Sequence, residues 1–411
     1  MGVSPAVSPH LAVPGAKAPP NASVKAKTLA ILNNSRSIPT PDGLSRATTP
    51  GDGTADLAEM MNNDVREQFV SGARLGEGTY AIVYRGHFRH DPSKLVAIKK
   101  MKVNVDYRDG ITMDSYREMK YLQELTTHPN IIRLHAVFTS KDQNINLVLE
   151  HLPKGDLEGL WKDSKTSYTR EDIKAWSAML CQAVWFCHEN HVLHRDIKGN
   201  NVLIAADNTL KLADFGLARS FSEPGRPMTC NVITRFYRPP ELLLGASHYG
   251  GCVDVWSTAC VIAELATRAF FLPSETDLQQ LTVITDLFGI PTEADWPGIS
   301  KLRHWEVSFK GAAPKRPQPL SHWRQRLPLM GDDGIDLLRA MMTMDPAKRL
   351  NARDVLKHPY WTNLPRPTKK ENLPQQGGNP EKKMGEDLKR RGGEVETGRT
   401  DKVARKLNFG A

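Results

Sequence analysis

The stretch His194-Arg195-Asp196-Ile197-Lys198-Gly199-Asn200-Asn201 places three reactive groups in one short segment. Asp196 can accept a proton from a hydroxyl, Lys198 can balance negative charge, and the amide of Asn201 can bind a magnesium ion. Phosphoryl transfer needs such groups, because its catalysis consists mainly of positioning and charge stabilisation. A His-Arg-Asp tripeptide alone is weak support, since it occurs by chance in many loops, so its partners elsewhere in the chain must decide.

Two partners precede this stretch. The segment Leu75-Gly76-Glu77-Gly78-Thr79-Tyr80-Ala81-Ile82-Val83 joins two predicted strands, and its glycines let the backbone approach phosphates closely. A dinucleotide-binding loop would lead into a helix, whereas a strand follows here; an ordinary glycine hairpin is the alternative. Lys99 then lies on a predicted strand, and Glu118, on a helix predicted over 113–125, can hold Lys99 by an ion pair.

Further partners follow on both sides of the opening stretch. The buried strand 146–150 is broken by Pro153-Lys154-Gly155, which predicts a hinge. Helical spacing of apolar residues predicts a helix over 170–188, and its Cys181 and Cys187 are expected in the core. A hairpin of 201–204 and 210–213 delivers Asp214-Phe215-Gly216, with Asp214 as a second magnesium ligand.

These elements occur in the one order that a protein kinase needs, and residues 69–361 resemble a eukaryotic serine/threonine protein kinase. The resemblance implies an α+β fold with two lobes. A β-rich N-lobe would span 69–150, a helical C-lobe would span 155–361, and ATP with magnesium would bind between them. The segments 76–80 and 234–245 resemble those of cyclin-dependent kinases.

Within that group the chain most resembles the fungal kinase of transcription factor IIH, the CDK-activating type. The stretches that carry this resemblance are Gly78-Thr79-Tyr80-Ala81, Lys120-Tyr121-Leu122-Gln123-Glu124-Leu125, Asn146-Leu147-Val148-Leu149-Glu150, Phe271-Leu272-Pro273 and Met342-Thr343-Met344-Asp345-Pro346. The resemblance implies a nuclear, proline-directed kinase that phosphorylates the RNA polymerase II C-terminal domain and, as a further activity, the activation loops of other cyclin-dependent kinases. Its implied partners are an H-type cyclin, an assembly factor and the transcription factor IIH core, with no direct contact to nucleic acid or membrane.

By similarity, Asp196 orients the substrate hydroxyl and accepts its proton, and Lys198 stabilises the γ-phosphoryl group. Asn201 and Asp214 would bind magnesium. The remaining residues implied at the ATP site are Leu75, Gly76, Glu77, Gly78, Thr79, Tyr80, Ala81, Ile82, Val83, Ala97, Lys99, Glu118, Leu149, Glu150, Leu152, Asp156 and Leu203. The hinge is about one residue longer than usual, which leaves the alignment of Asp156 open.

The resemblance also implies a switch and a substrate pocket. Thr229 stands at the position of the activating phosphothreonine, and the arginines that would clamp its phosphate are Arg117, Arg195 and Arg219. The pocket that selects proline after the phosphoacceptor would consist of Val232, Ile233 and Arg238. Glu241 should pair with Arg349, and Asp254 should anchor the catalytic loop. Thr79 and Tyr80 match inhibitory phosphorylation sites, and Glu223 falls where animal members carry a second phosphorylation site.

Some positions depart from the family pattern. Gly199 replaces a proline in the catalytic loop, which we expect to loosen the backbone and lower the rate. Pro239, Phe236 and Ala259 also differ from the usual residues, and none of these changes removes a catalytic group. Cyclin binding would use the helix over 113–125 and Gly110-Ile111 before it, where the sequence is divergent.

Composition separates the two ends of the chain from the rest. Residues 1–68 and 362–411 are rich in Pro, Gly, Ser or charge, which predicts a disordered extension and a disordered basic tail, although 56–68 has the pattern of a short helix. The net charge is +9, and residues 363–411 contribute 12 Lys and Arg against 7 Asp and Glu, so the excess lies partly in the tail. The run 389–391 is either a nuclear import signal or a solvated charge cluster.

Two other functions fit parts of the sequence. Pro239-Pro240-Glu241 also occurs in the elongation-type cyclin-dependent kinases, so the cyclin partner distinguishes the two types. A pseudokinase scaffold belongs to a different class, and the presence of every catalytic group argues against it. The five cysteines have no metal-ligand spacing and indicate reduced thiols in an intracellular protein.

Overall fold

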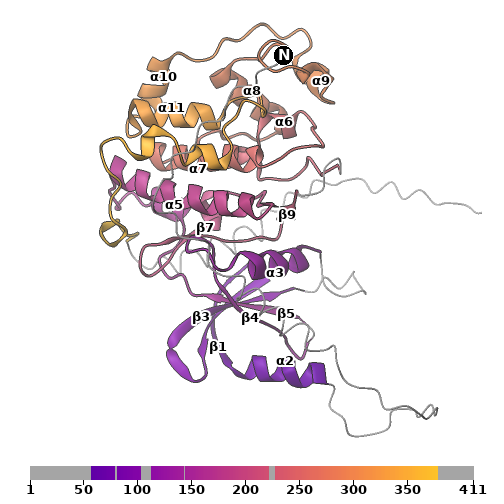
Figure 1. Cartoon of the computed structure of the whole chain (residues 1–411), viewed down its shortest axis with the longest axis vertical. Coiled ribbons are helices and arrows are strands. Elements are labelled where there is room, and N and C mark those ends of the chain that lie inside the picture. The colour runs from indigo at the N-terminus through magenta and orange to yellow at the C-terminus, as the bar shows by residue number, and fades with distance from the viewer. Residues whose placement is uncertain (1–56, 79–80, 103–112, 143, 222–226, 378–411) are drawn as a thin grey trace, which may run out of the picture. The chain divides into compact units, whose positions relative to one another are not determined.

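The computed structural model describes residues 57–78, 81–102, 113–142, 144–221 and 227–377. Its N-terminal part is a five-stranded antiparallel sheet of order β1-β2-β3-β5-β4 (Figure 1). The strands are β1 (Phe69–Glu77), β2 (Ala81–Phe88), β3 (Asp91–Met101), β4 (Leu134–Thr139) and β5 (Ile145–Glu150). The β-rich N-lobe predicted from the sequence is therefore confirmed.

The alternation of side chains along β3 positions the residues that matter for the site. Val96 and Ile98 are buried in a small core with Phe69, Phe138 and Val148. Ala97 and Lys99 point to the opposite face, because successive strand residues alternate. Helix α3 (Met113–Leu125) packs on that face through Tyr121, Leu122 and Leu125, and so brings Glu118 toward β3.

The C-terminal part is mainly helical, and α5 (Arg170–Glu189) and α7 (Cys252–Thr267) form its centre (Figure 1). Helix α5 starts at a capping box of Thr169 and Asp172, and every residue of α7 from Val253 to Ala266 is buried. Cys181 and Cys187 are buried in the core, as predicted, and all five cysteines are free. The other helices are α4 (Leu157–Lys162), α6 (Pro240–Leu243), α8 (Asp277–Phe288), α9 (Trp305–Phe309), α10 (Leu320–Arg326), α11 (Gly331–Met341) and α12 (Ala352–Val355).

Two short sheets shape the loop region next to the N-lobe. The predicted hairpin is present as β7 (Val202–Ile204) paired with β8 (Leu210–Leu212). Strand β6 (Val192–Leu193) pairs with β9 (Arg219–Ser220), which ties the segment before the catalytic loop to the segment after Asp214. These pairings bring the opening stretch of the sequence and Asp214-Phe215-Gly216 side by side.

Helix α2 (Leu57–Glu67) forms where residues 56–68 have the pattern of a short helix, so the folded part begins before the predicted boundary at residue 69. Asn62 of α2 bonds to the backbone of Thr139 on β4 in both directions. At the other end, residues 362–377 pack on the C-lobe instead of beginning a disordered tail. Lys174 donates to the carbonyl oxygens of Asn363 and Pro365, and Leu373 is buried. The bonds to Lys174 use backbone carbonyl groups, which the side-chain composition could not reveal, and Leu373 adds one buried apolar side chain.

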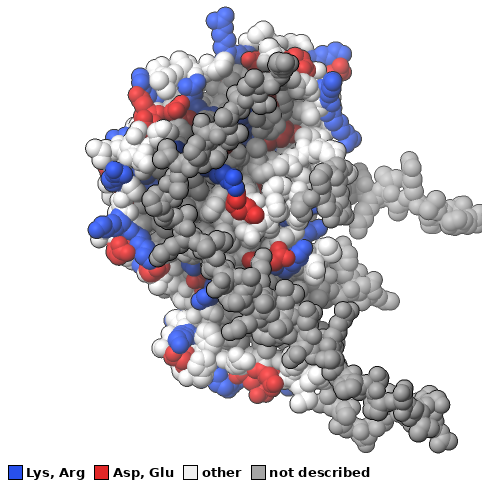
Figure 2. All heavy atoms as spheres, in the orientation of Figure 1, with Lys and Arg blue, Asp and Glu red and all other residues white. Residues whose placement is uncertain are grey.

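Charges of both signs are interspersed on the face shown in Figure 2. The predicted absence of a nucleic-acid partner stays a prediction. Within the described ranges, no helix is long and apolar enough to cross a membrane.

Candidate active site

A cleft of about 610 Å³ lies between the sheet and the helical lobe. Most residues predicted for the ATP site line it, namely Leu75, Gly78, Ala81, Val83, Ala97, Lys99, Glu118, Leu149, Glu150, Leu152, Asp156 and Leu203. The predicted residues Gly76, Glu77 and Ile82 do not line the cleft. Gly76 and Ile82 alternate with lining residues along β1 and β2, whereas the carboxylate of Glu77 pairs with Arg74 and Lys102. Thr79 and Tyr80 lie outside the described residues.

Several lining residues were missed by sequence reasoning. Met101 lies two residues after Lys99 on β3, so the alternation of side chains along a strand would have predicted that it faces the cleft. Asp114 at the start of α3 and Ile132 before β4 carry no local signal, since only the tertiary packing brings them to the cleft. The others are His151, Asn200, Ala213, Gly216, Leu217, Asn231 and Thr234.

Lys99 is held by two carboxylates from distant parts of the chain. Its Nζ atom lies 2.7 and 2.8 Å from the two carboxylate oxygens of Glu118 and 3.4 Å from Oδ1 of Asp214. Burial opposes the charge on Lys99, but the charges of Asp214 and Glu118 outweigh it and raise the pKa of Lys99 above its usual value. The charge of Lys99 in turn lowers the pKa of Asp214, whereas burial raises the pKa of Glu118. Lys99 therefore presents a fixed positive charge to the cleft.

The catalytic loop orients Asp196 by bonds to both of its carboxylate oxygens. Asn201 Nδ2 donates to Oδ2 at 2.9 Å, and Lys198 Nζ lies 2.8 Å from the same oxygen. Thr234 Oγ1 donates to Oδ1 at 2.9 Å and accepts from Lys198 at 3.2 Å. Sequence reasoning missed Thr234, although it directly follows the predicted proline pocket. Asp196, Lys198, Asn201 and Thr234 thus form one hydrogen-bonded group at the floor of the cleft.

The backbone of this loop is anchored from below by Asp254 of α7, which is fully buried. Its carboxylate accepts from the backbone amides of His194 at 2.9 Å and Arg195 at 2.8 Å, and His188 lies 3.0 Å away. Burial alone would raise the pKa of Asp254, but the hydrogen bond and charge of His188 lead the contributions that lower it. These bonds fix Arg195 with a positive φ of 64°, which an arginine does not adopt without such support. The buried pair expected between Glu241 and Arg349 is present at 2.7 and 2.8 Å.

The predicted phosphorylation site is connected to the catalytic loop through a residue that the sequence did not single out. Thr229 is exposed, and the Tyr249 hydroxyl donates to its carbonyl at 2.7 Å. Arg195 Nη1 donates to the same hydroxyl at 3.2 Å, and the charge of Arg219 also acts on Tyr249. Arg117 instead pairs with Asp114 at 2.8 Å. Two of the three predicted arginines therefore act on Tyr249. Glu223, the other predicted position in this segment, lies outside the described residues.

The predicted substrate pocket has an unusual backbone. Ile233 has a positive φ of 69°, which is strained for a β-branched residue. Arg238 Nε donates to the carbonyl oxygens of Val232 at 3.0 Å and Ile233 at 3.2 Å, and Nη1 binds Asp277 at 2.8 Å. The guanidinium thus already donates to the two carbonyl oxygens that could otherwise accept hydrogen bonds from a bound peptide.

The hinge and the catalytic loop meet at α4. Gly155 takes a positive φ of 79°, and Asp156 caps α4 by accepting from the backbone amide of Gly159 at 2.7 Å. The extra hinge residue is therefore accommodated by a left-handed glycine and a helix cap. A Cβ atom on Gly199 would lie 3.1–3.3 Å from backbone and Cβ atoms of Glu158 at the start of α4. Gly199 is explained by this close approach and does not need to be explained by a loose backbone.

Two side-chain oxygen groups at the floor of the cleft suit a magnesium ion as ligands. Asn201 uses Nδ2 for Asp196, which leaves its Oδ1 as a ligand, and the Asp214 side chain is 48% exposed and kept ionised by Lys99. Magnesium takes one or two protein oxygens and fills its other positions with water and phosphate. Among the described residues, no group of three or more His, Cys, Asp or Glu could hold a metal by itself. Asn201 and Asp214 fit an ion that arrives with a phosphate ligand.

Residues 69–361 match the family model described as a protein kinase domain. The serine/threonine-protein kinase KIN28 of Saccharomyces cerevisiae is 41% identical over 304 residues, which cover 74% of this chain and 96% of KIN28. Cyclin-dependent kinase 7 of Xenopus laevis is 43% identical over 303 residues, which cover 73% of this chain and 83% of that kinase.

A solved structure shows the same similarity in three dimensions. A chain of the CAK complex of Chaetomium thermophilum, bound to ATP-γ-S, matches with a TM-score of 0.76 and 54% sequence identity. The match covers 79% of this chain and 100% of the other.

Proposed function

This chain belongs to the protein kinase family as a cyclin-dependent serine/threonine kinase, and from that premise we propose that it phosphorylates the RNA polymerase II C-terminal domain within transcription factor IIH. The phosphoryl donor is ATP with magnesium, and the acceptor is a serine or threonine followed by proline. The activation loops of other cyclin-dependent kinases are a second substrate class. The observation that carries the proposal is the hydrogen-bonded group of Asp196, Lys198, Asn201 and Thr234, which lies in the same cleft as the fixed charge of Lys99.

The residues of the cleft divide the work of phosphoryl transfer. Lys99 would bind the α- and β-phosphates, and Asn201 and Asp214 would hold a magnesium ion, which would supply positive charge to the phosphates. Asp196 accepts a hydrogen bond from the acceptor hydroxyl and takes its proton as the hydroxyl oxygen bonds to the γ-phosphorus, while the bond from that phosphorus to the ADP oxygen breaks and ADP leaves. Lys198, 2.8 Å from Asp196, balances the charge on the transferring group. Thr234 holds the carboxylate of Asp196 in one orientation through its 2.9 Å bond.

Selection of proline follows from the backbone around Ile233. A residue that follows the phosphoacceptor would lie against Val232 and Ile233, whose carbonyl oxygens already accept from Arg238. An ordinary residue would bury its backbone N–H there without an acceptor, which costs about 1–3 kcal/mol. Proline has no backbone N–H and avoids this cost. The chain therefore favours proline by excluding the other residues.

Activation involves phosphorylation of Thr229. A phosphate there would meet the positive charges of Arg195 and Arg219, which already surround Tyr249 beside the Thr229 carbonyl. Arg117 can join them only by leaving Asp114, which requires a rotation of its exposed side chain on α3. The bond from Arg195 to Tyr249 links this switch to the loop that carries Asp196.

The partner of α3 is a cyclin, of H type in our proposal. Met113 and Tyr116 on α3 are 60% and 47% exposed, so large apolar side chains face outward beside Glu118. A cyclin that covers them would fix Glu118 and thereby Lys99. The assembly factor, the transcription factor IIH core and a nuclear location complete the proposal and rest on the similarity to KIN28 and cyclin-dependent kinase 7.

The test uses the chain in complex with its cyclin, identified by pull-down. The complex is incubated with radiolabelled ATP, magnesium and a peptide of Tyr-Ser-Pro-Thr-Ser-Pro-Ser repeats, with Asp196→Asn as the inactive control. We expect transfer to the repeat peptide and none to a peptide in which alanine replaces each proline. Absence of transfer by the intact complex would refute the proposal, and an elongation-type cyclin in the pull-down would replace it with the other kinase type.

A further inference from the structure

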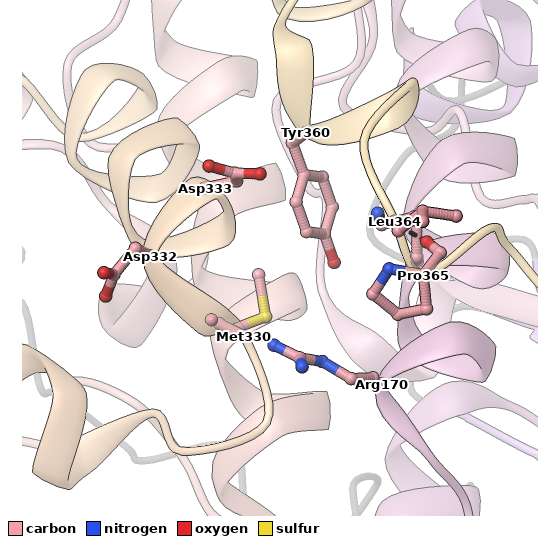
Figure 3. A pocket seen from close by; sticks show the side chains of 9 residues that line it. Arg170, Met330, Asp332, Asp333, Tyr360, Leu364 and Pro365 are labelled. Atoms are coloured by element: carbon pink, nitrogen blue, oxygen red, sulfur yellow. Dashed lines mark hydrogen bonds between the residues drawn. The ribbon is translucent and has the colours of Figure 1, made fainter.

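A second cavity, of about 250 Å³, lies on the C-lobe between the start of α5, the start of α11 and residues 360–365 (Figure 3). None of its lining residues lines the active-site cleft. It is smaller than the roughly 300–1,000 Å³ of sites for drug-sized ligands. Its volume suits one inserted side chain.

The hydroxyl of a largely buried tyrosine points into this cavity. Tyr360 is 3% exposed, and Figure 3 shows its hydroxyl directed into the space above Arg170. No residue that the structure describes forms a hydrogen bond with this hydroxyl, although a buried tyrosine usually has a partner. The hydroxyl oxygen is not among the side-chain atoms that are sealed from solvent without a partner, so it is open to the cavity and can donate a hydrogen bond to a ligand there.

Two cations line the same cavity. Lys174 is 3% exposed, lies 4.4 Å from the centre of the Tyr360 ring, and donates to Asn363 and Pro365 at 3.0 and 2.8 Å. An ammonium group has three N–H donors, so one remains. Arg170, the first residue of α5, has no carboxylate partner among the described residues, and its guanidinium extends into the cavity toward Met330 in Figure 3.

The acidic residues of the cavity limit the charge of its ligand. Asp332 is committed to Arg324, 2.7 Å away, and Asp333 accepts from Asn363 at 2.6 Å. Among the residues that line the cavity, the carboxylate of Asp333 therefore offsets one of the two cations, which leaves one positive charge without a carboxylate. A carboxylate matches this balance, whereas a phosphate dianion would exceed it.

We propose that this cavity binds the carboxylate of a glutamate or aspartate side chain from a partner protein. Arg170 would bind the two oxygens, a geometry that suits its planar donors, and the Tyr360 hydroxyl and the third donor of Lys174 would complete the site. Leu364, 81% exposed at the rim, would contact an apolar residue next to the acidic one. The site is separate from the catalytic cleft, so the inference does not rest on the proposed function.

The test titrates the peptide acetyl-Gly-Glu-Leu-Gly-amide against the full chain bound to its cyclin and measures binding by ligand-observed NMR. The matched peptide carries Gln in place of Glu. We expect the Glu peptide to bind about tenfold more tightly than the Gln peptide, and we expect Arg170→Gln to remove that difference. Tyr360→Phe keeps the ring beneath Lys174 and should weaken binding through loss of the hydroxyl alone.

Two controls keep the result interpretable. Arg353→Gln removes an exposed arginine that pairs with Glu189 away from the cavity, and it should leave binding unchanged. Kinase activity of Arg170→Gln on the repeat peptide should equal that of the wild type, which shows that the variant is folded. Equal binding of the Glu and Gln peptides, unchanged binding by Arg170→Gln, or tighter binding of a phosphoserine peptide would each overturn the carboxylate assignment.

Discussion

Replacing Gly199 by alanine should disturb the catalytic loop, because α4 leaves no room for a side chain there. The new Cβ would lie 3.1 Å from Cβ, 3.2 Å from N and 3.3 Å from Cα of Glu158. These are mostly backbone positions, so the contact cannot be relieved by turning a flexible side chain. Helix α4 is also tightly packed on another side, because a Cβ atom placed on Gly159 would lie 3.2 Å from the side-chain amide of Gln376.

The magnitude follows from two opposing terms. Inserting a methyl group into a packed contact costs about 1–3 kcal/mol. The smaller conformational freedom of alanine in the unfolded chain returns about 0.4–1 kcal/mol, because the backbone of Gly199 does not need a positive φ. The free energy of unfolding should therefore fall by about 1.3 kcal/mol, the difference between the middle values of the two terms, within limits of about 0–2.6 kcal/mol. The strain reaches Asn201 two residues later, so kcat should fall together with stability.

Differential scanning fluorimetry and kinase assays on the cyclin complex measure both effects. Gly250→Ala is the matched control, since a Cβ at Gly250 meets no atom within 4 Å, and it should leave Tm unchanged or slightly raised. Gly199→Ala should lower Tm by a few degrees and reduce kcat. A Tm for Gly199→Ala equal to or above that of Gly250→Ala would refute the packing argument and favour the loose-backbone interpretation of Gly199.

Three further predictions concern the cleft, the substrate pocket and a buried acid. Glu118→Gln removes the buried charge that holds Lys99 at 2.7 Å, and breaking such a pair costs about 3–5 kcal/mol. We therefore expect kcat/KM for ATP to fall at least about tenfold. An unchanged value would show that Asp214 alone holds Lys99. Arg238→Gln frees the carbonyl oxygens of Val232 and Ile233 to accept a hydrogen bond from the substrate backbone. The kcat/KM for Ser-Pro peptides divided by that for Ser-Ala peptides should then drop by about tenfold. A constant ratio would contradict the proposed basis of selectivity. Burial raises the pKa of Glu264 to about 8, above its usual value of 4.5, so the folded chain keeps a proton that the unfolded chain releases, and stability falls as pH rises between these values. Glu264→Gln cannot titrate, so its Tm relative to wild type should increase from about pH 6 to about pH 8.5, and a difference independent of pH would show that Glu264 does not hold that proton.

Sequence reasoning predicted the fold because the kinase elements combine local signals with a fixed order. The strand that carries Lys99, the helix that carries Glu118 and the hairpin before Asp214 each have their own periodicity, and the structure places them at the predicted positions. The sequence predicted the ion pair of Lys99 with Glu118, and the structure places Lys99 Nζ 2.7 Å from Glu118. The structure adds a contact that was not predicted, because Nζ also lies 3.4 Å from Asp214.

The remaining features depend on contacts between segments that no local pattern connects. Thr234 and Tyr249 carry ordinary side chains in sequence, and only the path of the chain places them beside Asp196 and Arg195. The packing of 362–377 uses backbone carbonyl groups, which every residue has, so composition misjudged that segment as disordered.

The sequence by itself determined the family, the lobes and the groups that carry the chemistry, because those depend on residue type, spacing and order. Only the tertiary structure decided which orientation each group takes. It showed that Gly199 lies against the backbone of Glu158, that Arg117 pairs with Asp114 instead of approaching Thr229, and that the Tyr360 hydroxyl points into a second cavity. These outcomes depend on distances of a few ångströms between residues far apart in the chain, which the order of amino acids alone does not specify.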